Sequence, residues 1–147
     1  MISRGIWVPG EVVATNRALS DQRAAGWAYG YREALVRMNR PTTPGRPRDR
    51  YAEGMHAMRA RTAIAARASG LVAPADVLRL RFAVHGHPRF DVAGAYLAVK
   101  AMEDGLVDAG VIESDRFNVG ESRVVVLRDQ GPQGVYISME ECPCAGA

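Results

Sequence analysis

Apolar residues recur at the spacing of one helical face in three stretches of the chain. These stretches are residues 20–38, residues 51–69 and residues 92–108. A glycine stands just beyond the second stretch, at Gly70, and another just beyond the third, at Gly110. Because glycine readily adopts the left-handed conformation that commonly follows a helix, the pattern predicts three helices, two of them with defined ends.

Four shorter segments have the composition or the alternation of β-strands. The clearest is residues 77–85, in which arginine alternates with apolar residues. The last two strands are separated by the sequence RDQGPQG, which is typical of a hairpin-like connection. Residues 6–15 predict a strand and a turn, with Pro9-Gly10 breaking the run, and the remaining two strands are predicted at residues 122–127 and 134–139.

The order of these elements predicts an α+β fold, a small mixed sheet with helices packed on it. At 147 residues and 48% hydrophobic content, the chain is long enough for one domain with its own core. We expect this single domain over residues 1–140 and a flexible tail at residues 141–147. The tail contains the chain's two cysteines, in the sequence CPC, and two thiols cannot complete a structural zinc site.

The sequence has no feature of a membrane or secreted protein. Its apolar runs are all shorter than the roughly 18 residues that indicate a membrane-spanning helix. The N-terminal sequence MISRGIWVPGEVV has neither the apolar stretch nor the small-residue cleavage site of a signal peptide. We therefore expect a soluble, cytoplasmic protein that makes no membrane contact.

Charge is distributed unevenly along the chain, although the net charge is only +3. Residues 1–90 carry fifteen arginines against six acidic residues, whereas residues 91–147 carry three arginines and Lys100 against ten. A GC-rich genome would explain the preference for arginine, but it would not explain this asymmetry. A basic part beside an acidic part suits a protein that binds a polyanion and holds a divalent metal against it.

Residues 39–50, NRPTTPGRPRDR, combine three prolines with closely spaced arginines and predict a basic loop. Such loops are often only solvated, but in a nucleic-acid-binding protein they contact phosphates. The candidate phosphate contacts are Arg46, Arg48, Arg50 and Arg89. Trp7, Trp27 and Tyr31 could stack on unpaired bases, although their spacing is more typical of core residues.

Lys100 is the only lysine in the chain, and acidic residues lie on both sides of it. In the predicted helix, Asp104 follows Lys100 by one turn on the same face. A tight return after the helix would bring Asp115 back toward Asp91, so that carboxylate oxygens converge near the lysine. The neighbouring acidic residues are Asp91, Glu103, Asp104, Asp108, Glu113 and Asp115.

Two interpretations of this acidic stretch remain open on spacing alone. Magnesium prefers oxygen ligands and keeps several of its waters, so two or three carboxylates are enough to hold it against a phosphate. In that case Lys100 would supply a fixed positive charge beside the phosphate. The alternative is a solvated helix with charged ends, which is common in proteins.

The stretch D-x8-K-A-x2-D-G-L-V-D-A-G-V-I-x2-D, from Asp91 to Asp115, resembles the signature of the RusA-like Holliday junction resolvases, especially those carried by phages of high-GC bacteria. The resemblance covers about residues 77–140 in the order of elements and is closest over residues 100–115. It implies a RusA-like fold and a homodimer. It also implies that the protein binds Mg²⁺ and makes paired cuts in a four-way DNA junction.

Carried over by position, the resemblance implies that Asp91 and Asp115 bind the metal and that Lys100 is the catalytic lysine. Glu113 is the candidate for a further metal ligand, because its longer side chain could replace a carboxylate that the family usually has and this chain lacks. The positions that depart from the family pattern are Ala93, Gly94 and Ser114.

The sequence therefore predicts a magnesium-dependent endodeoxyribonuclease that resolves branched DNA in recombination or repair, in a bacterial or phage-infected cell. The alternative is a non-catalytic DNA-binding protein on the same fold, with an eroded metal site. A small metabolic enzyme would fit the acidic part of the chain but would leave the basic loop without a role.

Overall fold

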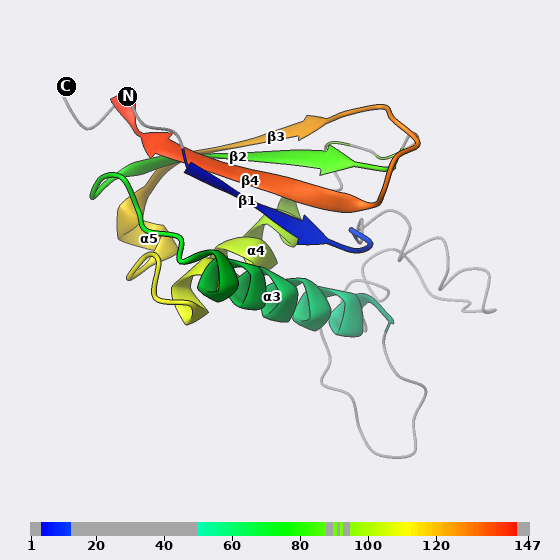
Figure 1. Cartoon of the computed structure of the whole chain (residues 1–147), viewed down its shortest axis with the longest axis horizontal. Coiled ribbons are helices and arrows are strands. Elements are labelled where there is room, and N and C mark those ends of the chain that lie inside the picture. Colours follow the sequence, from blue (N-terminus) through cyan, green and yellow to red (C-terminus); the bar gives the residue numbers. More distant parts are fainter. Residues whose placement is uncertain (1–3, 13–49, 88–89, 91, 93–94, 144–147) are drawn as a thin grey trace, which may run out of the picture.

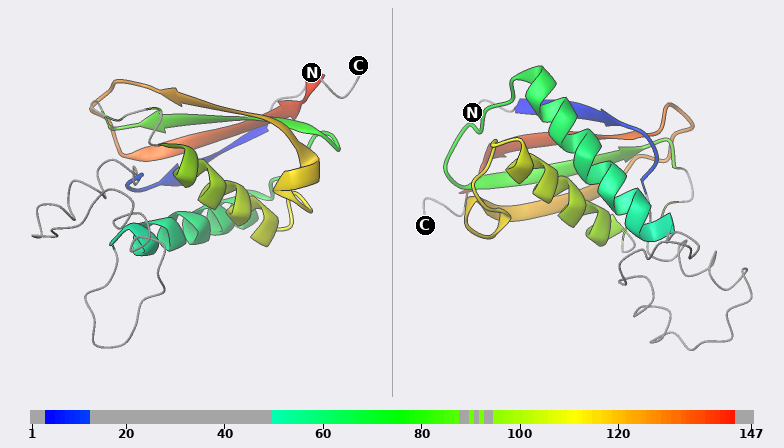
Figure 2. Two further views of the ribbon diagram at one scale, coloured as in Figure 1. Left: turned by 180° about the vertical axis from the view of Figure 1, so that it is seen from behind. Right: turned by 90° about the horizontal axis from the view of Figure 1, so that it is seen from below.

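The computed structural model describes residues 4–12, 50–87, 90, 92 and 95–143. Within them the elements are β1 (Arg4–Pro9), α3 (Arg50–Ser69), β2 (Leu78–His85), α4 (Tyr96–Asp108), α5 (Asp115–Asn118), β3 (Val119–Val126) and β4 (Gly134–Glu141). The four strands form one sheet, and α3 and α4 lie side by side on one of its faces (Figures 1 and 2). The expected α+β fold with a small mixed sheet is confirmed.

The strands are arranged in the order β1-β4-β2-β3. β2 and β3 pair in parallel and are connected through α4 and α5, whereas β4 runs antiparallel to both β1 and β2. The predicted hairpin between the last two strands is therefore wrong, because β2 lies between them. The turn sequence allows the chain to reverse, but it does not determine which strands pair. β2 is more deeply buried than β3 and takes the inner position.

The boundaries of several elements differ from those predicted. α3 and β2 begin within one residue of their predicted starts, but α4 begins at Tyr96 rather than at residue 92. β4 extends to Glu141, and Cys142 is buried after it, so these two residues of the expected tail pack with the domain. The predicted helix at residues 20–38 and residues 39–49 of the basic loop lie outside the described residues.

Both long helices end at a glycine, as predicted. Gly70 follows α3 with a φ of 64°, and Gly110 follows α4 with a φ of 76°. After α4, the Gly110 N–H donates to the carbonyl of Val107 (2.9 Å) and the Val111 N–H to that of Leu106 (3.0 Å). This pair of bonds is the Schellman motif, which satisfies carbonyls at the helix end and turns the chain sharply. The same pair of bonds ends α3.

The hydrophobic core lies between the sheet and the two long helices. Alternate residues of the strands point into it, because successive side chains of a strand project to opposite faces. Its largest fully buried members are Phe82, Met58, Leu78, Leu80, Met102, Leu106, Ile137, Met139, Val84 and Val135. The core fixes α4, and with it Lys100, against β2 and β3.

Gly105 lets α3 and α4 approach each other closely. A Cβ atom at this position would lie 2.6 Å from the backbone oxygen of Arg59 and 2.8 Å from the Cβ of Thr62. Thr62 is itself fully buried, and its hydroxyl donates to the carbonyl of Met58 (2.8 Å). A larger residue at Gly105 would therefore push the two helices apart.

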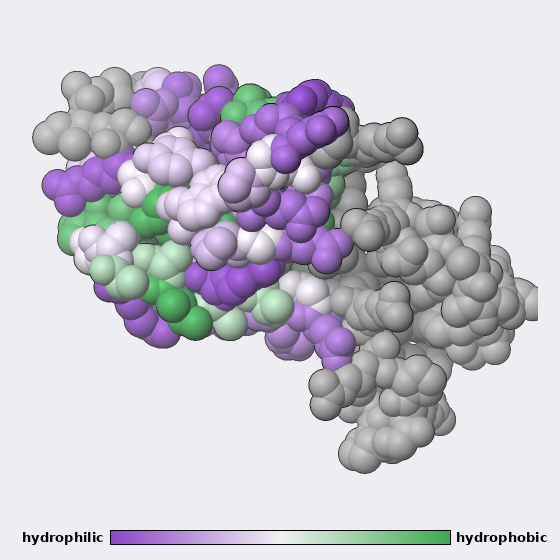
Figure 3. Space-filling view, turned by 45° about the vertical axis from the view of Figure 1, so that its right-hand side comes forward, coloured by the Kyte–Doolittle hydropathy of each residue, from purple (hydrophilic) through white to green (hydrophobic). Residues whose placement is uncertain are grey.

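The opposite face of the sheet is not covered by any described helix. Trp7 of β1 and Tyr136 of β4 lie on this face and are 40% and 42% exposed. The expectation that Trp7 is a core residue is therefore wrong. On the face seen in Figure 3, hydrophilic and weakly polar residues make up much of the described surface, with separate apolar patches. None of the described helices is long and apolar enough to cross a membrane.

Candidate carboxylate and lysine site

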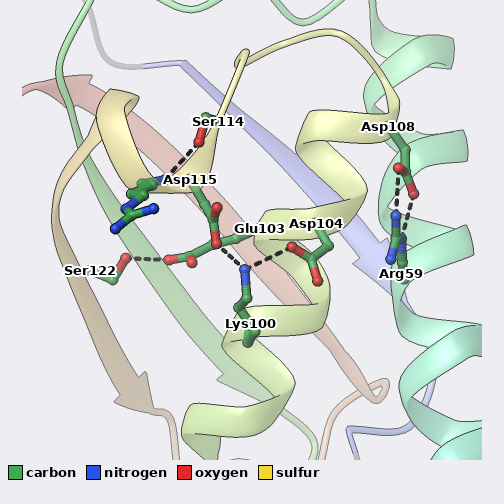
Figure 4. A network of polar contacts seen from close by, with 9 residues as sticks. Arg59, Lys100, Glu103, Asp104, Asp108, Ser114, Asp115 and Ser122 are labelled. Carbon is green, nitrogen blue, oxygen red and sulfur yellow. Dashed lines mark hydrogen bonds and ion pairs between the residues drawn. The ribbon is translucent and has the colours of Figure 1, made fainter.

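Lys100 joins two acidic side chains from different elements. Its ammonium group donates to the carboxylate of Asp104 on the same helix (2.9 Å) and to that of Asp115 at the start of α5. Figure 4 shows these side chains converging on the Lys100 amine. The Lys100 side chain is 55% exposed, whereas those of Asp104 and Asp115 are 30% and 24% exposed. The cluster is thus open to solvent on the lysine side.

The turn after α4 brings Asp115 to the lysine. The Schellman motif at Gly110 reverses the chain, and Ser114 then caps α5, because its hydroxyl accepts the Arg116 N–H (3.2 Å). Asn118 holds the turn from its other end. Its amide oxygen accepts the Glu113 and Ser114 N–H groups (3.1 and 2.9 Å), and its amide nitrogen donates to the Asp76 carbonyl (3.0 Å).

Glu103 is a third carboxylate beside the lysine, and no role was predicted for it from the sequence. It accepts a hydrogen bond from the hydroxyl of Ser122 on β3 (2.5 Å) and is half-buried (Figure 4). Burial raises the pKa of Glu103, and the charges of Asp115 and Asp104 raise it further, while Ser122 and Lys100 oppose the rise. The sequence did contain a signal that could have identified Glu103: it follows Lys100 by three residues in a helix, and residues at that spacing are neighbours.

The charges of the cluster favour a cation. Hydrogen bonds from Lys100 to Asp115 and then to Asp104 raise the pKa of the lysine, so it stays protonated at neutral pH. One positive charge therefore faces three carboxylates. Carboxylate oxygens are ligands that suit magnesium. Lys100 contacts one oxygen of Asp104 and one of Asp115. These residues therefore supply oxygen donors of the type that magnesium prefers.

The described residues alone do not form a complete metal site. Among them, no group of three or more histidine, cysteine, aspartate or glutamate side chains is arranged to hold a metal ion. The Glu113 side chain is exposed and takes part in none of the hydrogen bonds or ion pairs of the cluster given above. Asp91 lies outside the described residues, so its predicted contact with Asp115 stays a prediction.

Phe90, the residue before Asp91, is anchored by contacts with other parts of the domain. Phe90 is buried and its carbonyl accepts a hydrogen bond from Arg128 (2.6 Å). The Phe90 ring packs on that of His87 with centroids 5.3 Å apart, and His87 Nε2 accepts the Val12 N–H (3.3 Å). These contacts tie Phe90 to residues that follow β2 and β3, and through His87 to the residues that follow β1.

The predicted phosphate contacts fall mostly on parts of the chain that are not described. Arg46, Arg48 and Arg89 lie outside the described residues. Arg50 is the first residue of α3, where only its backbone is described. The role of these arginines in binding DNA stays a prediction.

No protein-family model matches this chain, and no curated protein matches it either. The motif between Asp91 and Asp115 and the geometry around Lys100 are therefore the grounds for a functional proposal.

Proposed function

We propose that this protein is a magnesium-dependent endodeoxyribonuclease that cuts branched DNA in the manner of the RusA-like Holliday junction resolvases. The contact between Lys100 and Asp115 carries the proposal. These residues are fifteen positions apart in the sequence, at the two ends of the best-matching part of the motif, and their side chains meet. A solvated helix with charged ends would not need the capped turn that brings Asp115 back to the lysine.

Each side chain has a distinct role in the proposal. Asp115, together with Asp91 as the resemblance implies, would hold the magnesium ion. Bound magnesium would make a water more acidic and offset negative charge on the attacked phosphate. Lys100 would lie beside that phosphate and stabilise the charge that develops during bond cleavage. Asp104 would orient the ammonium group and help to keep it protonated.

We also propose that the protein acts as a homodimer. A four-way junction has nearly two-fold symmetry and requires two matched cuts. A symmetric dimer, in which each protomer contributes one Lys100 cluster, meets that requirement with a single kind of interface.

Incubation of the purified full chain with a labelled four-way junction, with and without Mg²⁺, tests the proposal. We expect paired cuts in Mg²⁺ and none in EDTA. Asp115→Asn should abolish cutting while the junction is still bound, because asparagine keeps the shape of the aspartate side chain but removes the negative charge that would hold the metal. Asp76→Asn, an exposed aspartate outside the cluster, is the matched control. Wild-type cutting by Asp115→Asn would refute this site.

One observation favours the alternative of a non-catalytic DNA-binding protein. Ser114 stands where the family usually has an aspartate, and here its side chain caps α5 instead. The neighbouring Glu113 side chain is exposed and does not replace the missing carboxylate in the cluster contacts described here. This alternative predicts tight binding of the junction by the unmodified protein without cutting at any Mg²⁺ concentration.

A further inference from the structure

Two aromatic side chains lie flat on the face of the sheet opposite the helices. Trp7 of β1 and Tyr136 of β4 are directly paired across the two strands. A Cβ atom at Gly134 would overlap the Trp7 ring, and one at Gly5 would overlap the Tyr136 ring. Each ring therefore lies over the bare backbone of a glycine and presents its other face to solvent, in agreement with exposures of 40% and 42%.

The Trp7 ring is held in place from its side. The His85 ring packs against it in a T-shaped arrangement, with centroids 5.4 Å apart and an interplanar angle of 68°. His85 Nδ1 lies 2.9 Å from a carboxylate oxygen of Asp129, whose other oxygen accepts the Gly86 N–H (2.6 Å). A side chain fixed in this way loses little freedom when a ligand stacks on it.

Two arginines extend the same face beyond the aromatic rings. Arg81 of β2 and Arg123 of β3 are neighbours in the register of the parallel strands, and both are exposed. Arg123 pairs with Glu121 (2.5 Å), which also binds Arg79 (2.7 Å). Arg81 pairs with no acidic side chain among the described residues. Arg81 is therefore the arginine of this face whose charge no described carboxylate offsets, and it is the better placed of the two to bind a phosphate.

We infer that this face binds single-stranded DNA, with bases stacked on Trp7 and Tyr136 and with the phosphate backbone along Arg81 and Arg123. Aromatic rings beside positive charge are the combination that single-stranded nucleic acids bind. A duplex hides the faces of its bases within its own stack, so it could not use the two rings.

The sheet face is separate from the Lys100 cluster. Glu103 of that cluster bonds Ser122, which aligns with the buried Leu80 on the helix side of the sheet. The aromatic face could therefore bind DNA in a protein that does not cut. The choice of DNA over RNA rests on the proposed function, whereas the stacking surface itself does not.

Fluorescence of Trp7 gives a direct test. The chain has two tryptophans, so Trp27→Phe leaves Trp7 as the only reporter. Both measurements are made in EDTA, which prevents metal-dependent cutting. Addition of a dT12 oligonucleotide to the protein should quench Trp7 fluorescence. Addition of the protein to labelled dT12 should raise the anisotropy of the label, and the two titrations should give the same dissociation constant. Tyr136→Ala should weaken binding about 5- to 150-fold, the range typical of losing one stacked base. Tyr136→Phe should restore it.

Control variants that remove the same residue types outside this face separate the effects of stacking and charge at the face from effects on the whole protein. Tyr96→Ala removes an exposed tyrosine from α4, away from this face, and should leave binding unchanged. Arg81→Gln should reduce the slope of log K against log salt by about 0.7. Arg4→Gln, an exposed arginine of β1 in register with the buried Met139, should leave the slope unchanged.

Two outcomes would overturn the inference: binding of the oligonucleotide without quenching of Trp7, and unchanged affinity in Tyr136→Ala. If the unchanged affinity comes with a change of oligomeric state in analytical ultracentrifugation, the face is an interface between two copies of the chain. Tighter binding of the matched RNA oligonucleotide would overturn the choice of DNA. Failure to cut junctions bears only on the proposed function.

Discussion

Replacing Lys100 with methionine tests whether the lysine serves the reaction or the fold. Methionine keeps the length and helix propensity of the side chain and removes its charge. The variant therefore loses the ion pairs with Asp104 and Asp115 while α4 and its packing stay in place. If the lysine belongs to a catalytic site, the variant should fold normally and fail to cut DNA.

The structure sets the expected size of both effects. The Lys100 side chain is 55% exposed, and an exposed ion pair contributes only ~0.2–1 kcal/mol. Loss of both pairs should therefore lower the free energy of unfolding by about 1 kcal/mol, which corresponds to ~2–4 °C in a protein of this size. By contrast, removing one positioned group that stabilises transition-state charge slows a reaction about 100- to 1000-fold.

Thermal unfolding and single-turnover cleavage of a labelled four-way junction measure the two effects separately. Junction affinity in EDTA should change little, so that the loss appears in the rate and not in binding. Cleavage at the wild-type rate would refute a catalytic role for Lys100. A fall in melting temperature beyond about 10 °C would show that the ion pairs mainly hold the fold together.

Two further predictions concern the helix that carries the lysine. Gly105→Ala should lower the melting temperature by several degrees in thermal unfolding. Overpacking costs ~1–3 kcal/mol, and because a Cβ would lie 2.6 Å from the backbone oxygen of Arg59, we expect a cost in the upper part of that range, above the gain of about 1 kcal/mol in helix propensity. For Glu103, burial raises the pKa above its ordinary value, so the folded state binds this proton more tightly than the unfolded chain. Its contribution to stability is therefore lost as pH rises through the raised pKa. Measured by urea unfolding across a pH series that begins near the ordinary glutamate pKa of about 4.3, Glu103→Gln should lose less stability with rising pH than the wild type. The exposed Glu53→Gln is the control, and an identical pH dependence in Glu103→Gln and the wild type would contradict the burial of this charge.

Local signals in the sequence were sufficient for the ends of α3 and α4 but not for the short helix α5 or for the pairing of the strands. Gly70 and Gly110 marked the ends of two helices correctly, because the residue after a helix commonly takes a left-handed conformation and this preference depends on the local sequence alone. The pairing of β4 between β1 and β2 depends on contacts between residues far apart in the chain, such as Ile6 with Ile137 and Phe82 with Ile137. The sequence RDQGPQG was compatible with a hairpin, so only the tertiary structure could exclude one.

The contacts of the candidate site show the same difference between local and long-range signals. The contact of Lys100 with Asp104 follows from one helical turn, and the return of Asp115 was anticipated from the spacing after the helix. Helical spacing placed Glu103 near Lys100, but its hydrogen bond to Ser122 on β3, nineteen residues away, could not be predicted. That contact exists only once the parallel pairing of β2 and β3 has placed β3 beside α4.

The choice of lysine at position 100 is itself informative. Elsewhere the chain uses arginine to hold carboxylates: the Arg59 guanidinium binds both oxygens of Asp108 (2.6 and 2.8 Å) and links α3 to α4. Arginine presents a planar fork that occupies a carboxylate fully, whereas the ammonium of lysine is a compact point charge. Lys100 contacts one oxygen each of Asp104 and Asp115. An arginine there would compete with a metal ion for the same oxygens. A lysine neutralises part of the charge and leaves each carboxylate able to bind a second cation, as the proposed reaction requires.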